Sequence, residues 1–168
     1  MRINVFICAL SLLIAGASAN AAADVPAGQY TFDQGWKFRL CSDRNEVQSL
    51  VKSSGEADFR PVQIPHDWSV ELPFEAKAGG SAGYLPGGLG LYVKEFTLPA
   101  SIADARRISL VFDGVYHKAT VWLNGHLLGK HDYGYTDFTF DLSGCLKRKG
   151  VNRLVVFVDM EQQSRWYT

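Results

Sequence analysis

The feature that most constrains the fold is the Asn124-Gly125 pair, which lies between two runs of strand-forming residues, KATVWL and HLLGKH. A two-residue type I′ turn needs positive φ at both central positions, and Asn-Gly adopts it most readily. The sequence therefore predicts a β-hairpin in which Val121 lies opposite Leu128. Apolar side chains occur on both faces of this hairpin, so we expect it to be central in its sheet, with another element covering Trp122.

Strand patterns also occur elsewhere in the chain. Apolar and polar residues alternate in RISLVFDG (107–114) and TDFTFDL (136–142). Further strands are expected at 35–41, 60–64, 90–98 and 151–159, and a short helix at 45–53. About seven or eight short strands without alternating helices predict an all-β fold, an antiparallel β-sandwich or jelly roll.

The first residues have the pattern of a secretory signal peptide. Arg2 supplies a positive charge, Val5–Ala15 is an apolar stretch, and Gly16–Ala23 is a tail of small residues. The apolar stretch is shorter than the roughly 20 residues that span a bilayer. We therefore expect residues 1–23 to be removed, which leaves one exported domain at 24–168, periplasmic or extracellular and without membrane attachment.

The charge balance gives no sign of a nucleic-acid partner, and the cysteines leave open whether a disulfide forms. The chain carries 17 basic and 17 acidic residues, so no charge excess indicates nucleic acid as a partner. Two cysteines follow the predicted leader, Cys41 and Cys145. Export would permit a disulfide between them, but each lies in an apolar context where a buried free thiol is equally natural.

Motifs for cofactor, metal or catalytic chemistry are missing from the sequence. GHLLGK (125–130) is too short for a phosphate loop, and the 4 histidines lack the spacing of zinc ligands, so no cofactor or metal is expected. A glycosidase needs two carboxyl groups on either side of the scissile bond. The glutamates are scattered over turns and strand edges, and nothing in the sequence pairs them.

Four segments carry a resemblance to a known family: QIPHDWSVE (63–71), GYLPGGLGLYVKEFTLP (83–99), the long block 112–142, and SRWYT (164–168). Together they resemble the amino-terminal sugar-binding domain of glycoside hydrolase family 2, the β-galactosidase family. The resemblance implies a galactose-binding-like jelly roll at 24–168, truncated before its final strand. It also implies a later (β/α)₈ barrel that carries both catalytic glutamates. Such a barrel takes about 250 residues, more than this chain has, so no catalytic residue is expected here.

The same resemblance suggests which residues contact the ligand, a β-linked galactoside or related glycan. Aromatic planes cover the apolar faces of pyranose rings, and guanidinium groups donate to their hydroxyls. Arg165, Trp166 and Tyr84, the last on the glycine-rich loop 75–90, are therefore predicted to form the rim of the sugar pocket. Interdomain or structural packing is predicted for Trp68, Trp122 and Tyr167.

Two functional hypotheses follow. The chain is either the amino-terminal part of an exported β-galactosidase-like glycosidase, or a small exported carbohydrate-binding module that stands alone without catalysis. An independent module should close its sheets, because open edges invite pairing with other chains. The missing final strand favours the first hypothesis.

Overall fold

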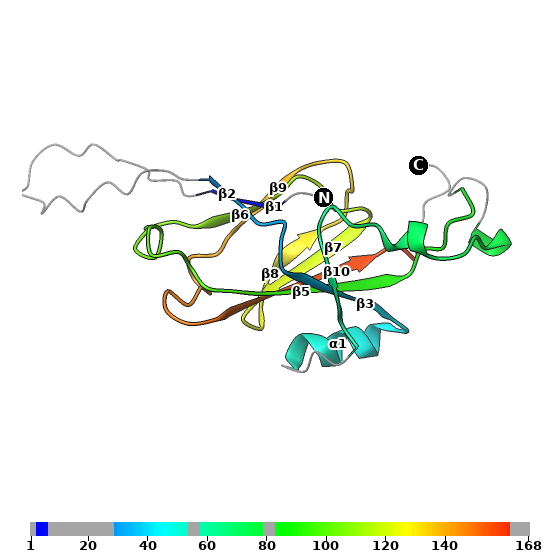
Figure 1. The fold of residues 1–168 in the computed structure, drawn as a ribbon, viewed down its shortest axis with the longest axis horizontal. Helices are drawn as coiled ribbons and strands as arrows, with labels where there is room; N and C mark the ends of the chain where they lie inside the picture. Colours follow the sequence, from blue (N-terminus) through cyan, green and yellow to red (C-terminus); the bar gives the residue numbers. More distant parts are fainter. Residues whose placement is uncertain (1–2, 7–28, 54–57, 79–82, 162–168) are drawn as a thin grey trace, which may run out of the picture.

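The computed structural model describes residues 3–6, 29–53, 58–78 and 83–161. They form two antiparallel sheets packed face to face (Figure 1), which confirms the predicted all-β sandwich. The first sheet has the order β2-β1-β6-β9: Gln29–Thr31, Ile3–Phe6, Ser109–Phe112 and Phe138–Asp141. The second has the order β4-β3-β5-β10-β7-β8: Arg60–Val62, Trp36–Cys41, Leu89–Phe96, Asn152–Asp159, Lys118–Leu123 and His126–His131.

Alternating side chains from both sheets fill the space between the layers. Leu110 and Phe112 of β6 are fully buried, as are Leu154 and Val156 of the central strand β10. Phe112 also stacks on Phe138, with ring centroids 4.6 Å apart. Burying each such side chain stabilises the fold by roughly 1.5–3 kcal/mol, so this layer holds the two sheets together.

A short helix, α1 (Arg44–Lys52), covers the outer face of the six-stranded sheet. Asp43 caps its first turn, because its carboxylate accepts hydrogen bonds from the backbone N–H groups of residues 45 and 46. Val47 and Val51 of the helix pack into a second buried cluster on this face, and Trp122 packs against the same cluster. The helix predicted at 45–53 and the cover expected for Trp122 are both confirmed.

The hairpin forms with the predicted turn but with a different register. Asn124 and Gly125 have φ values of 52° and 83°, as a type I′ turn requires. Val121 pairs with Gly129 instead of Leu128, because a β-bulge inserts Leu128 as an extra residue in β8. The hairpin is also not central, because β8 forms the edge of the sheet. Both of these expectations were therefore wrong.

Amide side chains fasten the hairpin to β10. Asn124 Nδ2 donates to Asn152 Oδ1 and to the carbonyl of Cys145, each at 2.8 Å, and Asn124 Oδ1 accepts from Arg153 N at 3.0 Å. Asn152, which is 0% exposed, also accepts from Lys147 N at 2.8 Å and donates to Lys147 O at 2.9 Å. The amide groups of both asparagines are thus satisfied by partners on three segments.

Strand β1 lies inside the predicted signal peptide, residues 1–23, which were not expected to be part of the fold. Its backbone pairs with β2 on one side and β6 on the other. Extended apolar sequences such as INVF have high β propensity and pair readily with sheet edges. Cleavage of residues 1–23 remains a prediction. Within the described ranges, no helix combines the length and apolar character needed to cross a membrane.

The two cysteines that follow the predicted leader are free thiols in different clusters, Cys41 on the outer face of the sheet and Cys145 against the main core. Burial, reinforced by the carboxylate of Glu46, raises the pKa of Cys41 to about 11. We therefore expect Cys41 at pH 8 to react with iodoacetamide about 100-fold more slowly in the folded chain than in urea. Peptide mapping by mass spectrometry measures both rates, and equal rates would contradict the burial of this thiol.

Candidate functional site

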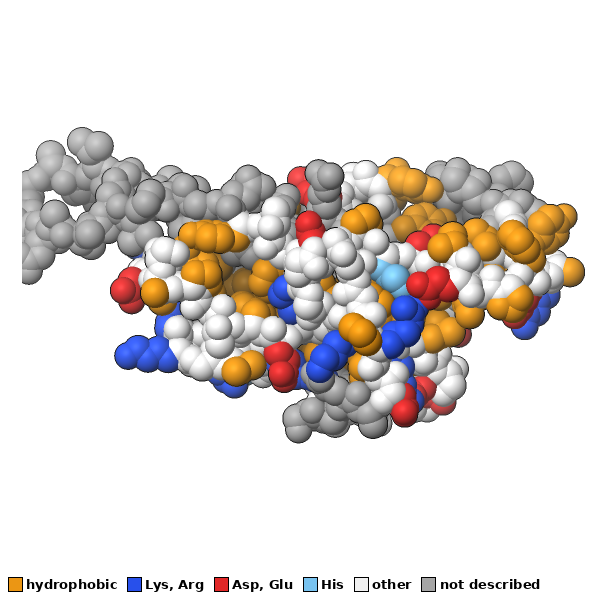
Figure 2. Space-filling view, in the orientation of Figure 1, with side chains coloured by type: hydrophobic (Ala, Val, Ile, Leu, Met, Phe, Trp, Pro, Cys, Tyr) orange, Lys and Arg blue, Asp and Glu red, His pale blue; other side chains and the backbone are white. Residues whose placement is uncertain are grey.

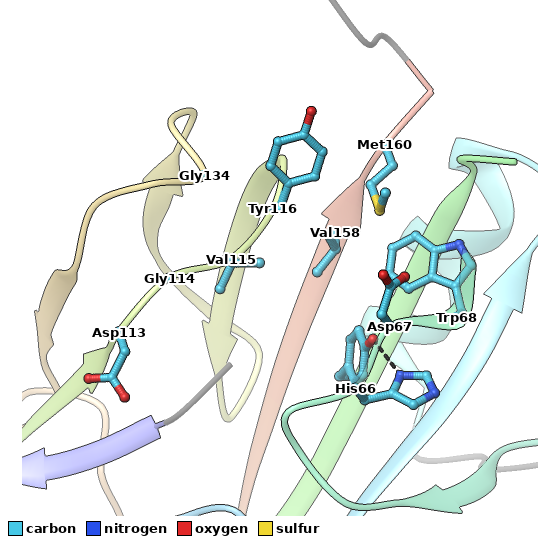
Figure 3. A pocket seen from close by; sticks show the side chains of 11 residues that line it. His66, Asp67, Trp68, Asp113, Gly114, Val115, Tyr116, Gly134, Val158 and Met160 are labelled. Atoms are coloured by element: carbon cyan, nitrogen blue, oxygen red, sulfur yellow. Dashed lines mark hydrogen bonds between the residues drawn. The ribbon is translucent and has the colours of Figure 1, made fainter. Parts of the chain in front are cut away.

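A cavity of about 400 Å³ lies between two walls that rise on either side of β10 (Figure 3). One wall consists of the segment 66–68 with Tyr92, and the other of the segment 113–116 with Gly134. Val158 and Met160, at the end of β10, lie between them. The cavity is therefore assembled from the ends of strands and the loops that follow them, which is where binding sites on sandwich domains commonly occur.

Trp68 is the main aromatic group of the first wall, and it is held in a single position. Its indole nitrogen donates to the carbonyl of Gly87 at 3.0 Å, and its ring stacks on Phe38 at 5.5 Å between centroids. The close approach of β5 needs a glycine, because a Cβ at Gly90 would lie 2.7 Å from Trp68 Cζ3. The neighbouring Asp67 caps the short helix η1 (Trp68–Glu71), since it accepts from Ser69 N at 2.9 Å.

A series of side-chain hydrogen bonds runs from the cavity to the surface. Tyr92 Oη lies 2.7 Å from His66 Nδ1, and His66 Nε2 lies 3.2 Å from Glu71 Oε1. Arg60 in turn binds the carboxylate of Glu71. Burial, reinforced by the nearby Asp67 carboxylate, raises the pKa of Tyr92 well above its usual range. The phenol therefore stays neutral and lines the cavity as a polar but uncharged group.

The second wall carries a row of tyrosines. Tyr116 lines the cavity. The ring centroids of Tyr116 and Tyr135 are 5.6 Å apart, and those of Tyr135 and Tyr133 are 5.8 Å apart. Tyr133 and Tyr135 are 55% and 64% exposed. The residue between Tyr133 and Tyr135 has to be a glycine, because a Cβ at Gly134 would lie 2.7 Å from Tyr116 Cδ2. We call Tyr116, Tyr133 and Tyr135 the tyrosine platform.

The charges around the cavity are of one sign. Asp67 and Asp113 line it, and no lysine or arginine is among the described residues that do. Polar hydroxyl, imidazole and carboxylate groups on aromatic and aliphatic walls suit a hydroxyl-rich ligand. In the described part of the chain, no group of three or more His, Cys, Asp or Glu side chains is arranged to hold a metal ion.

Of the residues predicted at the pocket rim, Arg165 and Trp166 lie outside the described residues, as does Tyr167, which was predicted to pack. Tyr84 is 51% exposed and has a φ of 62°. Its carbonyl accepts from Glu75 N at 2.8 Å, and it does not line the cavity. Trp68, for which interdomain or structural packing is predicted, is buried and also lines the cavity.

No ligand role was predicted from the sequence for the other cavity residues. The segments HDW (66–68), DGVY (113–116) and DYGY (132–135) were visible within the blocks that carry the family resemblance. Nothing in their local pattern shows that they meet, because the folding of the two sheets brings them together. The usable signal was the clustering of tyrosines around glycines in DGVY and DYGY.

Comparisons with known proteins agree with this structure. The family model described as glycosyl hydrolases family 2, sugar binding domain, matches residues 30–168, and the chain belongs to this family. It is 37% identical over 158 residues to the beta-galactosidase BoGH2A of Bacteroides ovatus, covering 91% of this chain and 18% of that protein. A putative beta-glucuronidase of Formosa agariphila is 36% identical over 141 residues, covering 81% of this chain and 13% of that protein.

Solved structures show the same likeness. A beta-glycosidase from Bacteroides vulgatus superposes with a TM-score of 0.68 and 36% identity, covering 77% of this chain and 17% of that one. A Bacteroides uniformis beta-glucuronidase gives a TM-score of 0.66 with 25% identity over 80% of this chain and 15% of that one. The chain thus spans less than a fifth of the length of these relatives.

Proposed function

We propose that this chain is the non-catalytic, amino-terminal domain of an exported β-glycosidase of the β-galactosidase type. In this role it helps to shape the sugar pocket of a catalytic (β/α)₈ barrel. The observation that carries the proposal is the family match over residues 30–168, combined with the 18% of the Bacteroides ovatus relative that the chain covers. Export rests on the predicted leader at residues 1–23.

The chemistry of the cavity supports a non-catalytic role. Retaining hydrolysis uses two carboxyl groups about 5–5.5 Å apart, one of them kept protonated by an apolar environment. Among the described residues that line the cavity there is no glutamate, and its two aspartates, Asp67 and Asp113, are exposed. One of them, Asp67, is already engaged as the cap of η1. This arrangement does not provide an acid and a nucleophile.

An exposed apolar surface supports packing against a further domain. Val70, in the short helix η1, is 64% exposed, and Phe74, between η1 and η2 (Ala76–Ala78), is 76% exposed. Figure 2 shows apolar side chains gathered over this end of the molecule. Apolar groups clustered on a surface often mark a protein interface. The barrel proposed above is the partner that this surface would contact.

The proposal predicts that the 168-residue chain does not hydrolyse 4-nitrophenyl β-galactoside or the corresponding β-glucuronide. Release of nitrophenolate measures turnover, and an active β-galactosidase assayed in parallel shows that the substrate is competent. Turnover by this chain that disappears in Asp67→Asn or Asp113→Asn would place catalysis in the cavity and overturn the proposal.

A further inference from the structure

We propose that the tyrosine platform stacks a neutral pyranose ring at the mouth of the cavity, and that it selects neutral sugars over uronic acids. This inference rests on the proposed sugar-binding role and adds to it a place and a ligand class. Tyr116, Tyr133 and Tyr135 are the residues that carry it.

The backbone that carries the tyrosine platform is held in place without a ligand. Tyr133 and Tyr135 stand on the short connection between β8 and β9, which is fixed internally by a hydrogen bond of 3.0 Å between His131 Nε2 and Thr136 Oγ1. The His131 ring also stacks on Phe138 of β9, with centroids 4.2 Å apart. On the cavity side, Gly134 packs directly against Tyr116. A ligand therefore meets rings whose supporting backbone is already in place, so that little ordering is needed on binding.

The chemistry of the platform fits a sugar ring. More than half of the surface of Tyr133 and of Tyr135 faces solvent, although large aromatic groups usually contribute to stability by being buried. Tyrosine offers a flat apolar face for the C–H groups of a pyranose and a hydroxyl for its oxygens, and it has few rotamers to lose. Tyr116 continues this surface into the cavity, where Asp67 and the segment 113–116 add polar acceptors.

The charges near the platform favour an uncharged ligand. Asp132 and Asp137 flank the two exposed tyrosines in the sequence, and both are exposed. Asp67 and Asp113 line the adjoining cavity. Between residues 131 and 137 the sequence HDYGYTD contains no lysine or arginine. The carboxylate of a uronic acid would enter this region against like charges, whereas a galactoside would not.

The test compares methyl β-galactoside with methyl β-glucuronide by saturation-transfer NMR and isothermal titration on the 168-residue chain. We expect weak binding of the galactoside, and affinity for the glucuronide that is lower by about fivefold at low salt. The double variant Tyr133→Ala/Tyr135→Ala should weaken galactoside binding by about tenfold. Tyr135→Phe, which keeps the ring and removes the hydroxyl, should lose much less.

The matched control is Phe74→Ala, which removes an aromatic ring that is 76% exposed but lies outside the platform. Its galactoside affinity should equal that of the unsubstituted chain, and thermal melting shows that every variant is folded. Three results would overturn this proposal: unchanged binding in the double tyrosine variant, tighter binding of the glucuronide, or no binding of either sugar. None of these results affects the non-catalytic role, which the nitrophenyl assay decides separately.

Discussion

Replacing Asn152 by alanine is expected to lower the free energy of unfolding by about 3 kcal/mol. The side chain is 0% exposed and exchanges hydrogen bonds with Asn124 Nδ2, Lys147 N and Lys147 O. Alanine would remove the partner of Lys147 N and of Lys147 O and would leave Asn124 Nδ2 with only the Cys145 carbonyl. Each buried group that loses its partner costs about 1–3 kcal/mol. Domains of this size are stable by roughly 5–15 kcal/mol, so the loss is a large share.

Urea unfolding followed by circular dichroism measures the change, with the slope checked for two-state behaviour. Asn45→Ala is the control, because Asn45 is exposed in the first turn of α1 and should change stability by no more than about 0.5 kcal/mol. If the two variants lost equal stability, the amide network would not be what fastens the hairpin to β10.

Gly90→Ala is expected to cost about 2 kcal/mol and to displace a wall of the cavity. The new Cβ would lie 2.7 Å from Trp68 Cζ3, 2.9 Å from Trp68 Cη2 and 3.0 Å from Phe38 Cε2. Both rings are buried and stacked on each other, so neither can move without disturbing the other. We therefore expect altered tryptophan fluorescence together with the lower unfolding midpoint.

A matched glycine serves as the control for this substitution. Gly144 has ordinary φ, and a Cβ placed there meets no heavy atom within 4 Å, so Gly144→Ala should leave both stability and fluorescence nearly unchanged. Fluorescence that is unaltered in Gly90→Ala would show that Trp68 is not confined by β5.

Local signals predicted the strands, the helix and the hairpin turn, because each depends on residues close in the sequence. Asn124-Gly125 specifies its own backbone conformation, and α1 begins at a capping aspartate. The bulge at Leu128 was not predictable in this way. Next to the bulge, Gly129 faces Phe140 of the other sheet so closely that a Cβ would lie 2.5 Å from Phe140 Cε1, and this contact involves a residue distant in the sequence.

The cavity was harder to predict for the same physical reason. Trp68, Tyr116 and Met160 belong to separate segments, and only the pairing of the strands places them around one space. Periodicity shows which side of a strand is buried, but it does not show which loops converge at its end. The family resemblance supplied the sugar-binding class and directed attention to Tyr84, which lies on a loop outside the cavity wall.

The position of β10 determines when the six-stranded sheet can close during synthesis. The strand lies in the centre of the six-stranded sheet, between β5 and β7, yet it is the last strand of the described chain. While the ribosome is still producing residues 36–131, the groups β4-β3-β5 and β7-β8 can pair only within themselves, because nothing joins them. They unite when Asn152–Asp159 has emerged, and distant pairings of this kind close slowly. The nascent chain therefore remains open until synthesis of the sheet is complete.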